Sequence, residues 1–356
     1  MRASRNLLAG WTAIALSACA TPGIDYTARV APGNPDAATF RSVAVSEFSG
    51  PFSAWYTDQF EAMLEGAVYE GAPWFDVGLF PAQSNVVGVY DGWVDISYPD
   101  IFERFYTTSD CVKRDEETDK CLKKVEIEHV CVRYTVAASA HPRLIDKATG
   151  DIIHEATYLG EDSEEECFET GHVEYRIRRQ PGDPGKGKYR FAYDDYINPG
   201  YRPGPGRIID RISAGALYAT LWQVRQDIAP YNQVTRATIL TEAQDFEVAA
   251  DPRFAQAVDA IKDKQPQIGC ALFNDLAARY PSAPAVLHNA GACAEASGDQ
   301  TEAQALYGSA AAAARALGVE LPERMLQALS RISIQRVDEQ ILQELVLEEP
   351  DPIPAS

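Results

Sequence analysis

Hydrophobic residues recur with two different periods along the chain, and the change of period divides it into two parts. In the first part, runs with strand character at 41–48 and 86–96 end at glycine, proline or charged residues. A longer run at 125–145 alternates apolar and polar positions and changes phase at Glu128–His129, which predicts a β-bulge there. Segment 152–159 is expected to pair back on this run as the second strand of a hairpin.

Helical spacing separates and follows these strands. Apolar residues at every third or fourth position predict helices over 53–67 and 207–228. Residues 234–240 are expected to return to the sheet as a last strand. From residue 251 onward the chain is alanine-rich and helical in pattern. The predicted fold class is therefore α/β, a mixed sheet with helices on one side, followed by an all-α C-terminal part.

A repeat makes the prediction for the C-terminal part more specific. Phe273 and Tyr307 lie 34 residues apart, which is the period of tetratricopeptide repeats. Gly291 and Ala303 place small residues where the two helices of such a hairpin approach each other closely. We predict tetratricopeptide-like helical hairpins over 246–345, which would present a groove to a protein partner.

The first residues have the pattern of an export signal. Arg2 and Arg5 precede an uncharged apolar run at 7–16, which is too short to span a bilayer as a helix. The run ends in Leu16-Ser17-Ala18-Cys19, which resembles the lipobox of bacterial lipoproteins. The resemblance implies removal of a signal peptide, residues 1–18, and attachment of lipid to Cys19. An ordinary secretory signal cut near Cys19 is the alternative, and it too implies export.

The residues after Cys19 bear on where the protein is held. Ala20 stands where enterobacterial lipoproteins carry an inner-membrane retention aspartate, so the resemblance implies the outer membrane, on its periplasmic face. Pro22, Pro32 and Pro35, with neighbouring glycines, predict a flexible tether over 19–39 that lifts the fold off the membrane. The lipid chains are then the expected membrane anchor.

Charge excludes one class of partner. Residues 1–18 contain Arg2 and Arg5 and no acidic residue, so without them the chain carries 30 basic against 52 acidic residues, a formal charge of −22. Nucleic acid is excluded as an expected partner, because its phosphates require a basic surface. The acidic, proline-rich tail 346–356 is predicted to be disordered.

Six cysteines remain after Cys19, an even number that predicts disulfides in an exported protein. Sequence alone leaves many connectivities open. Chain reversals about 115–117, 146–151 and 281–282 favour three local pairs: Cys111 with Cys121, Cys131 with Cys167, and Cys270 with Cys293. The spacings match no Cys-x-x-Cys or mixed Cys/His cluster, so no metal site is predicted.

Residues 40–240 resemble a family of periplasmic domains. Val43-Ala44-Val45-Ser46-Glu47-Phe48-Ser49-Gly50, a helix, and then Phe75-Asp76-Val77 are similar to the opening of CsgG-like lipoprotein domains. The hairpin Leu144-Ile145-Asp146 to Thr149-Gly150-Asp151-Ile152-Ile153 is also similar to that group. The resemblance implies an α/β domain over 40–245, of a kind related to the N-terminal domain of TolB and to LpoB-type activators of peptidoglycan synthases. The cysteine-rich insertion 108–124 and the long segment 161–206 depart from the family pattern.

One segment of this domain combines basic and aromatic residues in an otherwise acidic protein. Two alternating runs, 173–178 and 188–193, flank a Pro/Gly-rich link and predict a protruding hairpin within 172–206. Arginine and aromatic side chains are common anchors of protein interfaces. The candidate partner-binding residues are Tyr175, Arg176, Arg178, Arg179, Tyr189, Arg190 and Phe191. The alternative is a structural hairpin that covers an edge of the sheet.

Motifs of the common enzyme classes are absent from the sequence. It has no Gly-x-Ser-x-Gly, no phosphate-binding loop, no His-Glu-x-x-His and no Gly-x-Gly-x-x-Gly after a strand. We therefore predict a protein that is not an enzyme, with no catalytic residues, no cofactor and no small-molecule substrate. The expected function is that of a membrane-anchored periplasmic lipoprotein that binds or scaffolds an envelope protein through its helical repeats. The alternatives are a regulator of peptidoglycan synthesis and a component of an outer-membrane secretion or assembly complex.

Overall fold

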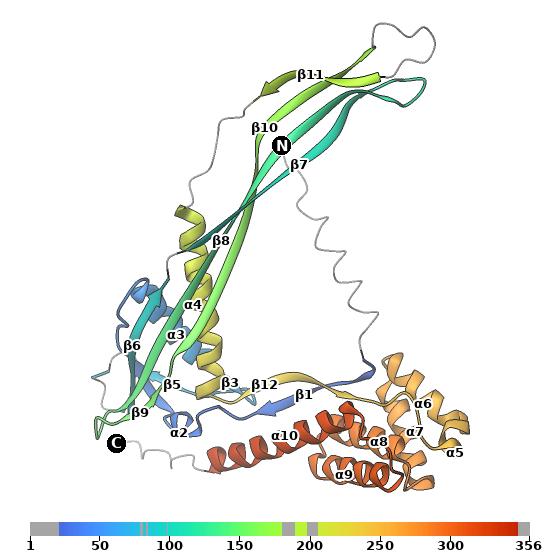
Figure 1. Ribbon diagram of the computed structural model, residues 1–356. Helices are drawn as coiled ribbons and strands as arrows, with labels where there is room; N and C mark the ends of the chain where they lie inside the picture. Colours follow the sequence, from blue (N-terminus) through green and yellow to red (C-terminus); the bar gives the residue numbers. More distant parts are fainter. Residues whose placement is uncertain are drawn as a thin grey trace. The chain divides into compact units, whose positions relative to one another are not determined.

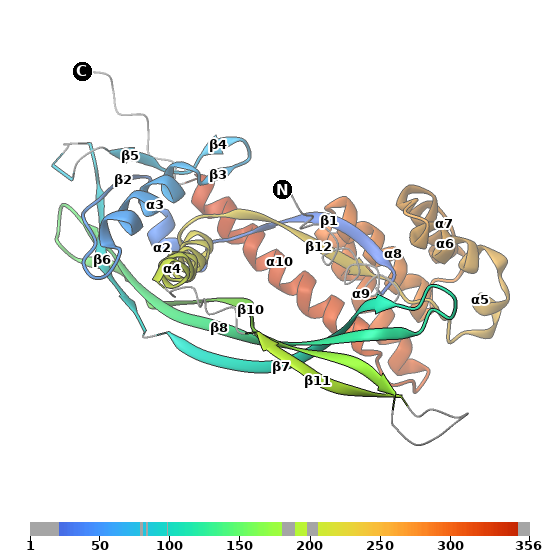
Figure 2. The same cartoon turned by 90° about the horizontal axis from the view of Figure 1, so that it is seen from above.

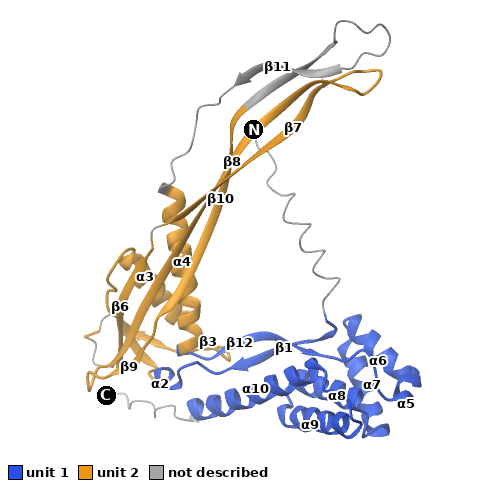
Figure 3. Cartoon of the chain, in the orientation of Figure 1, with its two compact units in different colours: residues 1–39, 228–356 blue, residues 40–227 orange. Residues whose placement is uncertain are grey.

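The computed structural model describes residues 21–78, 81–82, 85–97, 99–179, 189–197 and 206–347 (Figure 1). The chain divides into two compact units, which Figure 3 colours separately. Unit 1 combines residues 1–39 with residues 228–356, and unit 2 contains residues 40–227. The two ends of the chain thus belong to the same unit.

Unit 2 is built on a mixed eight-stranded sheet. Its strands are β2 (Ser42–Val45), β5 (Asp76–Gly78), β6 (Gly88–Ile96), β7 (Asp100–Arg114), β8 (Cys121–Asp146), β9 (Ile152–Glu155), β10 (Tyr158–Arg179) and β11 (Tyr189–Ile197). They are ordered β11-β10-β8-β6-β2-β5, and β7 and β9 pair with β8. β2 pairs in parallel with β5 and β6, whereas the other pairs are antiparallel. A separate two-stranded sheet joins β3 (Val68–Tyr69) and β4 (Ala72–Pro73).

Two helices, α3 (Ser53–Glu65) and α4 (Gly206–Ile228), cover one face of this sheet (Figure 2). Helix α3 buries Tyr56 and Phe60, whose rings lie 5.1 Å from the ring of Phe48. At Gly160 of β10, a Cβ atom would lie only 1.9 Å from the Ala216 carbonyl oxygen of α4, so the helix rests directly on the strand. The predicted α/β class, with helices on one side of a mixed sheet, is confirmed.

Strands β7, β8 and β10 continue beyond the part of the sheet that α3 and α4 cover (Figure 1). Strand β8 has 26 residues and β10 has 22. On β7, Ile101, Phe102 and Phe105 are 52%, 60% and 70% exposed. Among the described residues this extension is therefore a single layer, which depends on its backbone ladders and its disulfides for stability.

The predicted bulge lies where the hydrophobic alternation of β8 changes phase. Glu169 of β10 pairs with His129, and the next pair along the ladder joins Gly171 to Glu128. Thr170 is therefore the extra residue, and it stands on β10 rather than on β8. The irregularity near Glu128–His129 is confirmed, although the partner strand carries the insertion.

Unit 1 joins the first strand of the chain to the C-terminal helices. Strand β1 (Gly23–Val30) pairs antiparallel with β12 (Tyr231–Thr238). The helices are α2 (Pro35–Ala38), α5 (Phe246–Ala250), α6 (Pro252–Lys262), α7 (Pro266–Arg279), α8 (Pro284–Ser297), α9 (Gln300–Ala316) and α10 (Glu323–Leu347). Helices α5 to α10 pack around a continuous apolar core that also contains Ile24 of β1. Across the described ranges, no helix combines the length and apolar character needed to cross a membrane.

The prediction of a flexible tether over 19–39 is wrong from Gly23 onward. Residues 23–30 form β1, and the short helix α2 begins at Pro35. Ile24 and Ala28 face the core of unit 1 and are 7% and 8% exposed. The prolines and glycines on either side suggested a linker, but the alternation of apolar and polar residues between them decides the structure, because β12 offers a strand with which to pair.

The predicted domain boundary at 245/246 is also wrong. The division falls at 227/228, so β12 belongs with the helices. The expected last strand does form at 231–238, but it pairs with β1 and not with the mixed sheet.

Close helix packing in unit 1 involves the small residues of the predicted repeat. A Cβ atom at Gly291 of α8 would lie 2.9 Å from the Tyr307 ring of α9. Ala303 and Ala310 of α9 are fully buried. Helix α10 follows α9 and extends two residues beyond the predicted end of the helical part at residue 345.

Alanine substitutions at two helical glycines are expected to change the stability of unit 1 in opposite directions. Gly291→Ala forces the Tyr307 ring to move, and overpacking of this kind costs about 1–3 kcal/mol. Gly308 of α9 has open space where its Cβ would stand, so Gly308→Ala is expected to stabilise the unit by about 0.5–1 kcal/mol through helix propensity. Urea unfolding followed by far-ultraviolet circular dichroism measures both changes. Equal stability of the two variants would contradict the packing at Gly291.

Candidate partner-binding site

The predicted lipid-attachment residue, Cys19, lies outside the described residues, as does the tail from residue 348 onward. The basic–aromatic hairpin is described in its strands: residues 172–179 of β10 pair antiparallel with β11. It continues the main sheet, with β11 added at the edge beside β10. The side chains of its seven candidate residues lie outside the described part of the structure, so partner binding by this hairpin stays a prediction.

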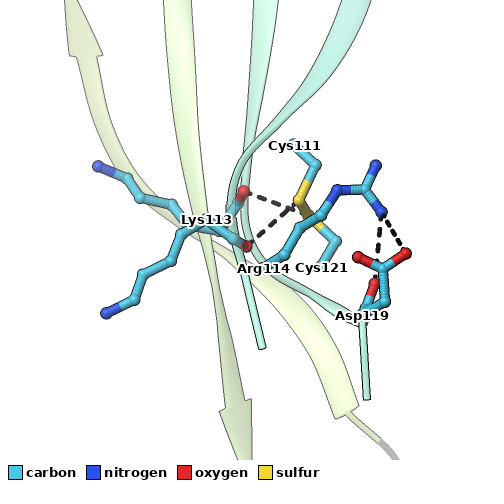
Figure 4. Close-up of a disulfide and its surroundings, with 6 residues drawn as sticks. Cys111, Lys113, Arg114, Asp119 and Cys121 are labelled. Atoms are coloured by element: carbon cyan, nitrogen blue, oxygen red, sulfur yellow. Dashed lines mark hydrogen bonds and ion pairs between the residues drawn. A yellow bond between two sulfur atoms is a disulfide. The ribbon is translucent and has the colours of Figure 1, made fainter. Parts of the chain in front are cut away.

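The three disulfides join the cysteines that local chain reversal predicted. Cys111–Cys121 bridges β7 and β8 next to the turn that connects them, where Arg114 Nη1 lies 3.4 Å from Asp119 Oδ2 (Figure 4). Cys131–Cys167 joins β8 to β10 at directly paired positions. Cys270–Cys293 joins α7 to α8 in unit 1.

Glu165 lies beside the Cys131–Cys167 disulfide, and its carboxylate could be mistaken for part of a metal site. Both sulfur atoms are taken up by the disulfide, whereas a metal needs thiolates. The carboxylate instead lies 3.6 Å from Arg104 and 3.6 Å from Arg133. This group is therefore a cross-strand ion-pair cluster around a structural disulfide.

A polar cavity of about 730 Å³ lies within unit 1, between β1, the α8–α9 turn and α10. Its wall is rich in amide, hydroxyl and charged groups, and its lining residues are Arg29, Ser297, Gly298, Asp299, Gln300, Thr301, Arg336, Glu339, Gln340 and Gln343. Arg29 donates two hydrogen bonds to Glu339, at 2.8 and 2.7 Å. Such a wall suits a polar chain segment that both donates and accepts hydrogen bonds.

A buried polar network joins the same three elements, and its centre is Glu295 of α8, whose side chain is 0% exposed. Arg331 of α10 donates to both carboxylate oxygens, at 2.5 and 2.8 Å. Tyr307 donates to Oε2 at 2.6 Å, and Tyr26 of β1 donates to Oε1. Gln335 of α10 in turn donates to the Tyr26 hydroxyl at 2.5 Å. The network therefore fixes β1 against the helices that border the cavity.

The two tyrosine hydroxyls of this network stay protonated, which fixes the direction of their hydrogen bonds. Burial, and then the adjacent Glu295 carboxylate, raise the pKa of Tyr307 well above its usual range, so its hydroxyl stays a donor. Burial likewise raises the pKa of Tyr26. The carboxylate thus accepts from two phenols and one guanidinium, the pairing that a buried charge requires.

Helix α8 also holds the end of β12. Asn289 forms two hydrogen bonds with the backbone of Leu240, at 2.7 and 2.8 Å. His288 is fully buried, and its Nε2 lies 3.0 Å from the Thr238 carbonyl oxygen. Its Nδ1 has no hydrogen-bond partner among the described residues. Burial lowers the pKa of His288 from 6.5 to about 4, so the folded unit holds it neutral.

Unit 1 is expected to lose stability as the pH falls from about 6.5 to about 4. In this window the unfolded chain binds a proton at His288, whereas the folded chain does not, so acid favours unfolding by up to about 1.4 kcal/mol per pH unit. His288→Gln retains a donor for Thr238 but does not titrate. As the pH falls, the free energy of unfolding of the wild type, measured with urea, should decrease more than that of the variant. A constant difference would contradict a neutral buried His288.

Sequence reasoning missed Glu295, Arg331 and Tyr26. One signal was present: Glu295 is the only charged residue in α8, which otherwise consists of apolar and small residues with one histidine and one asparagine. A charge on a helix buried nearly all round requires a partner. The sequence does not say that the partners come from residues 26 and 331.

No protein-family model matches the chain. No curated protein matches it either. A solved structure from Helicobacter pylori, described as a neuraminyllactose-binding hemagglutinin homolog, aligns with a TM-score of 0.25 and 13% identity. The alignment covers 56% of this chain and 88% of that chain. A likeness at this score supports no conclusion about fold or function, and the resemblance to CsgG-like domains stays a prediction.

Proposed function

We propose that this protein is a lipoprotein of the bacterial envelope, lipidated at Cys19 and held at the periplasmic face of the outer membrane. The lipobox carries this proposal, and the three disulfides support it, because disulfides persist in oxidising compartments. A lipid anchor is consistent with a chain whose signal segment ends in Leu16-Ser17-Ala18-Cys19.

The anchored protein acts, in this proposal, as a binding or scaffolding factor for another envelope protein, and the helices of unit 1 form a tetratricopeptide-like module. The 34-residue spacing of Phe273 and Tyr307 and the close approach of Gly291 to Tyr307 support such a module. The polar cavity beside α10 is the best candidate for the contact with a partner, because the Glu295 network holds three of its bordering elements in place.

Membrane attachment is expected to depend on a single side chain. Cys19→Ser, expressed in a bacterium with a lipoprotein pathway, should move the protein from the membrane to the soluble periplasmic fraction or leave its signal uncleaved, because the acyl chains are the proposed anchor. Mass spectrometry of the N-terminal peptide of the wild type should find a diacylglyceryl group on Cys19. Cys270→Ser paired with Cys293→Ser is the control, since it replaces two cysteines, and removes their disulfide, while Cys19 stays in place. A wild-type N-terminus without lipid would refute the anchor.

Partner capture is expected to depend on the cavity. Gln340→Ala combined with Gln343→Ala removes two exposed amides from its wall on α10. Recovery of a crosslinked envelope partner should fall about tenfold, the equivalent of about 1.4 kcal/mol. Gln327→Ala, at an exposed position of the same helix outside the cavity, is the control. A partner recovered equally with both variants would place the contact elsewhere.

A further inference from the structure

The number of residues between Cys19 and the start of the described structure limits how far the fold can lie from a lipid on Cys19. Arg236 of β12 donates to the Thr21 carbonyl oxygen at 3.4 Å, and the Ile239 amide donates to the Pro22 carbonyl oxygen at 3.0 Å. Strand β1 then begins at Gly23. In the sequence, Ala20 is the single residue between Cys19 and the first backbone group that unit 1 holds.

We infer that the surface of unit 1 around the start of β1 sits directly on the phospholipid bilayer. The inference rests on the proposed lipidation of Cys19. An extended chain spans at most about 3.3–3.6 Å per residue, so the lipidated residue stays within about 7 Å of Thr21. A spacer of that length is no longer than the headgroup layer, roughly 5–8 Å on each side of the hydrocarbon core, so it keeps the fold at the membrane surface.

Release of β1 cannot lengthen this spacer without unfolding the unit. Ile24 belongs to the apolar core, and the Tyr26 hydroxyl belongs to the Glu295 network. At its other end, Arg29 holds Glu339 of α10. Detaching the strand would expose the core and leave a buried carboxylate with one donor fewer, and breaking such a site is strongly destabilising.

The residues beside the start of β1 suit contact with a bilayer surface. Asp25 pairs with Arg236 at 2.6 Å across the two strands, which leaves no net charge on the strands there. The pKa of Asp25 is lowered first by its hydrogen bond to Arg236 and further by the charges of Arg236 and Lys264, so Lys264 of the α6–α7 turn lies within electrostatic reach. Ile268, four residues after Lys264 in the sequence and near the start of α7, is 54% exposed.

The exposed residues Arg236, Lys264 and Ile268, which we take as the candidate contact set, combine an aliphatic side chain with two long basic ones. Long basic side chains keep their charges among headgroups while their stems lie along apolar surface, and an exposed isoleucine gains by entering the apolar region. Asp25 already neutralises Arg236, so the expected contact does not require anionic lipid.

Fluorescence quenching on vesicles tests the inference with the full lipidated chain. Ile268→Cys and, separately, Val346→Cys are labelled with an environment-sensitive fluorophore and reconstituted into phosphatidylcholine vesicles that contain a spin-labelled lipid. Val346 is the matched control, because it is 50% exposed and lies seven residues beyond Glu339, which marks the opposite end of β1. We expect severalfold stronger quenching at position 268 than at position 346.

A linker insertion distinguishes direct contact of this surface with the bilayer from mere proximity to the vesicle. A Gly/Ser linker of about twenty residues inserted between Ala20 and Thr21 gives a flexible reach of roughly 25 Å. Quenching at position 268 should then fall to the level at position 346 while the N-terminal peptide keeps its lipid. Equal quenching at the two positions of the lipidated chain, or quenching at 268 that survives the linker, overturns the inference alone. An N-terminal peptide that never carries lipid overturns the proposed function and the inference together.

Discussion

Glu295→Ala is expected to destabilise unit 1 by about 3–5 kcal/mol, the cost of breaking a buried ion pair by removing one partner. The substitution leaves the Arg331 guanidinium in a largely buried position without its carboxylate, at the point where Glu295 had accepted hydrogen bonds at 2.5 and 2.8 Å. It also deprives the Tyr307 hydroxyl of the acceptor at 2.6 Å. A loss of this size is a large fraction of the stability of an ordinary domain.

The tryptophans provide an internal control for this measurement. After removal of residues 1–18, the chain retains Trp55, Trp74, Trp93 and Trp222, all of which belong to unit 2. Urea unfolding followed by far-ultraviolet circular dichroism should therefore show a component that shifts to lower urea, whereas the tryptophan fluorescence transition should stay where it is. Glu320→Ala, at an exposed position between α9 and α10, should change neither transition by more than about 0.5 kcal/mol.

The double replacement Glu295→Leu with Arg331→Met distinguishes a paired charge from a generally sensitive position. Removing both charges leaves no buried ion without a partner, and apolar replacements of similar size are often close to neutral. The double variant is therefore expected to be more stable than Glu295→Ala. If the double variant lost as much free energy of unfolding as Glu295→Leu and Arg331→Met together, the loss in Glu295→Ala would not come from breaking the Glu295–Arg331 pair.

Removal of the Cys131–Cys167 disulfide is expected to destabilise unit 2 by about 3–4 kcal/mol. The bond closes a loop of 36 residues and joins directly paired residues of β8 and β10. Cys131 is fully buried and lies between Val130 and Val132, which are also buried, so the bond ties together a packed part of the ladder. Both the entropy of the unfolded chain and the register of the two longest strands therefore depend on it.

Tryptophan fluorescence during urea unfolding measures the effect of Cys131→Ala with Cys167→Ala. The matched control is Cys111→Ala with Cys121→Ala, which opens a loop of only 10 residues near the connecting turn. The chain-entropy relation gives a smaller loss, about 2.5–3 kcal/mol, for that shorter loop. A larger loss from the shorter loop would contradict the proposed role of Cys131–Cys167.

Local sequence patterns were sufficient to predict those features that depend on residues close together in the chain. The helices at 53–65 and 206–228 follow from apolar spacing, and the bulge opposite Glu128–His129 follows from a change of phase. The three disulfides follow from chain reversals that bring cysteines 10, 36 and 23 residues apart to opposite positions. In each case the contact partners are close in the sequence or are related by the period of a single element.

Contacts between residues far apart in the sequence could be identified only from the tertiary structure. The sequence showed alternation at Ile24, Tyr26 and Ala28, but it did not show that a strand more than 200 residues later would accept them. Composition alone therefore favoured a tether, since a lone strand with unpaired backbone groups has no stability in water.

The buried carboxylate shows the same division between sequence and tertiary structure. The position of Glu295 within an apolar helix established that a charge would be buried and would need donors. Which donors meet it depends on how β1, α8, α9 and α10 pack, because side-chain periodicity defines the face of an element but not the element that faces it. The fold class thus comes from the linear sequence, as do the predictions of an export signal and an oxidising compartment. The position of the first strand, and with it the spacing between Cys19 and the fold, was decided by packing.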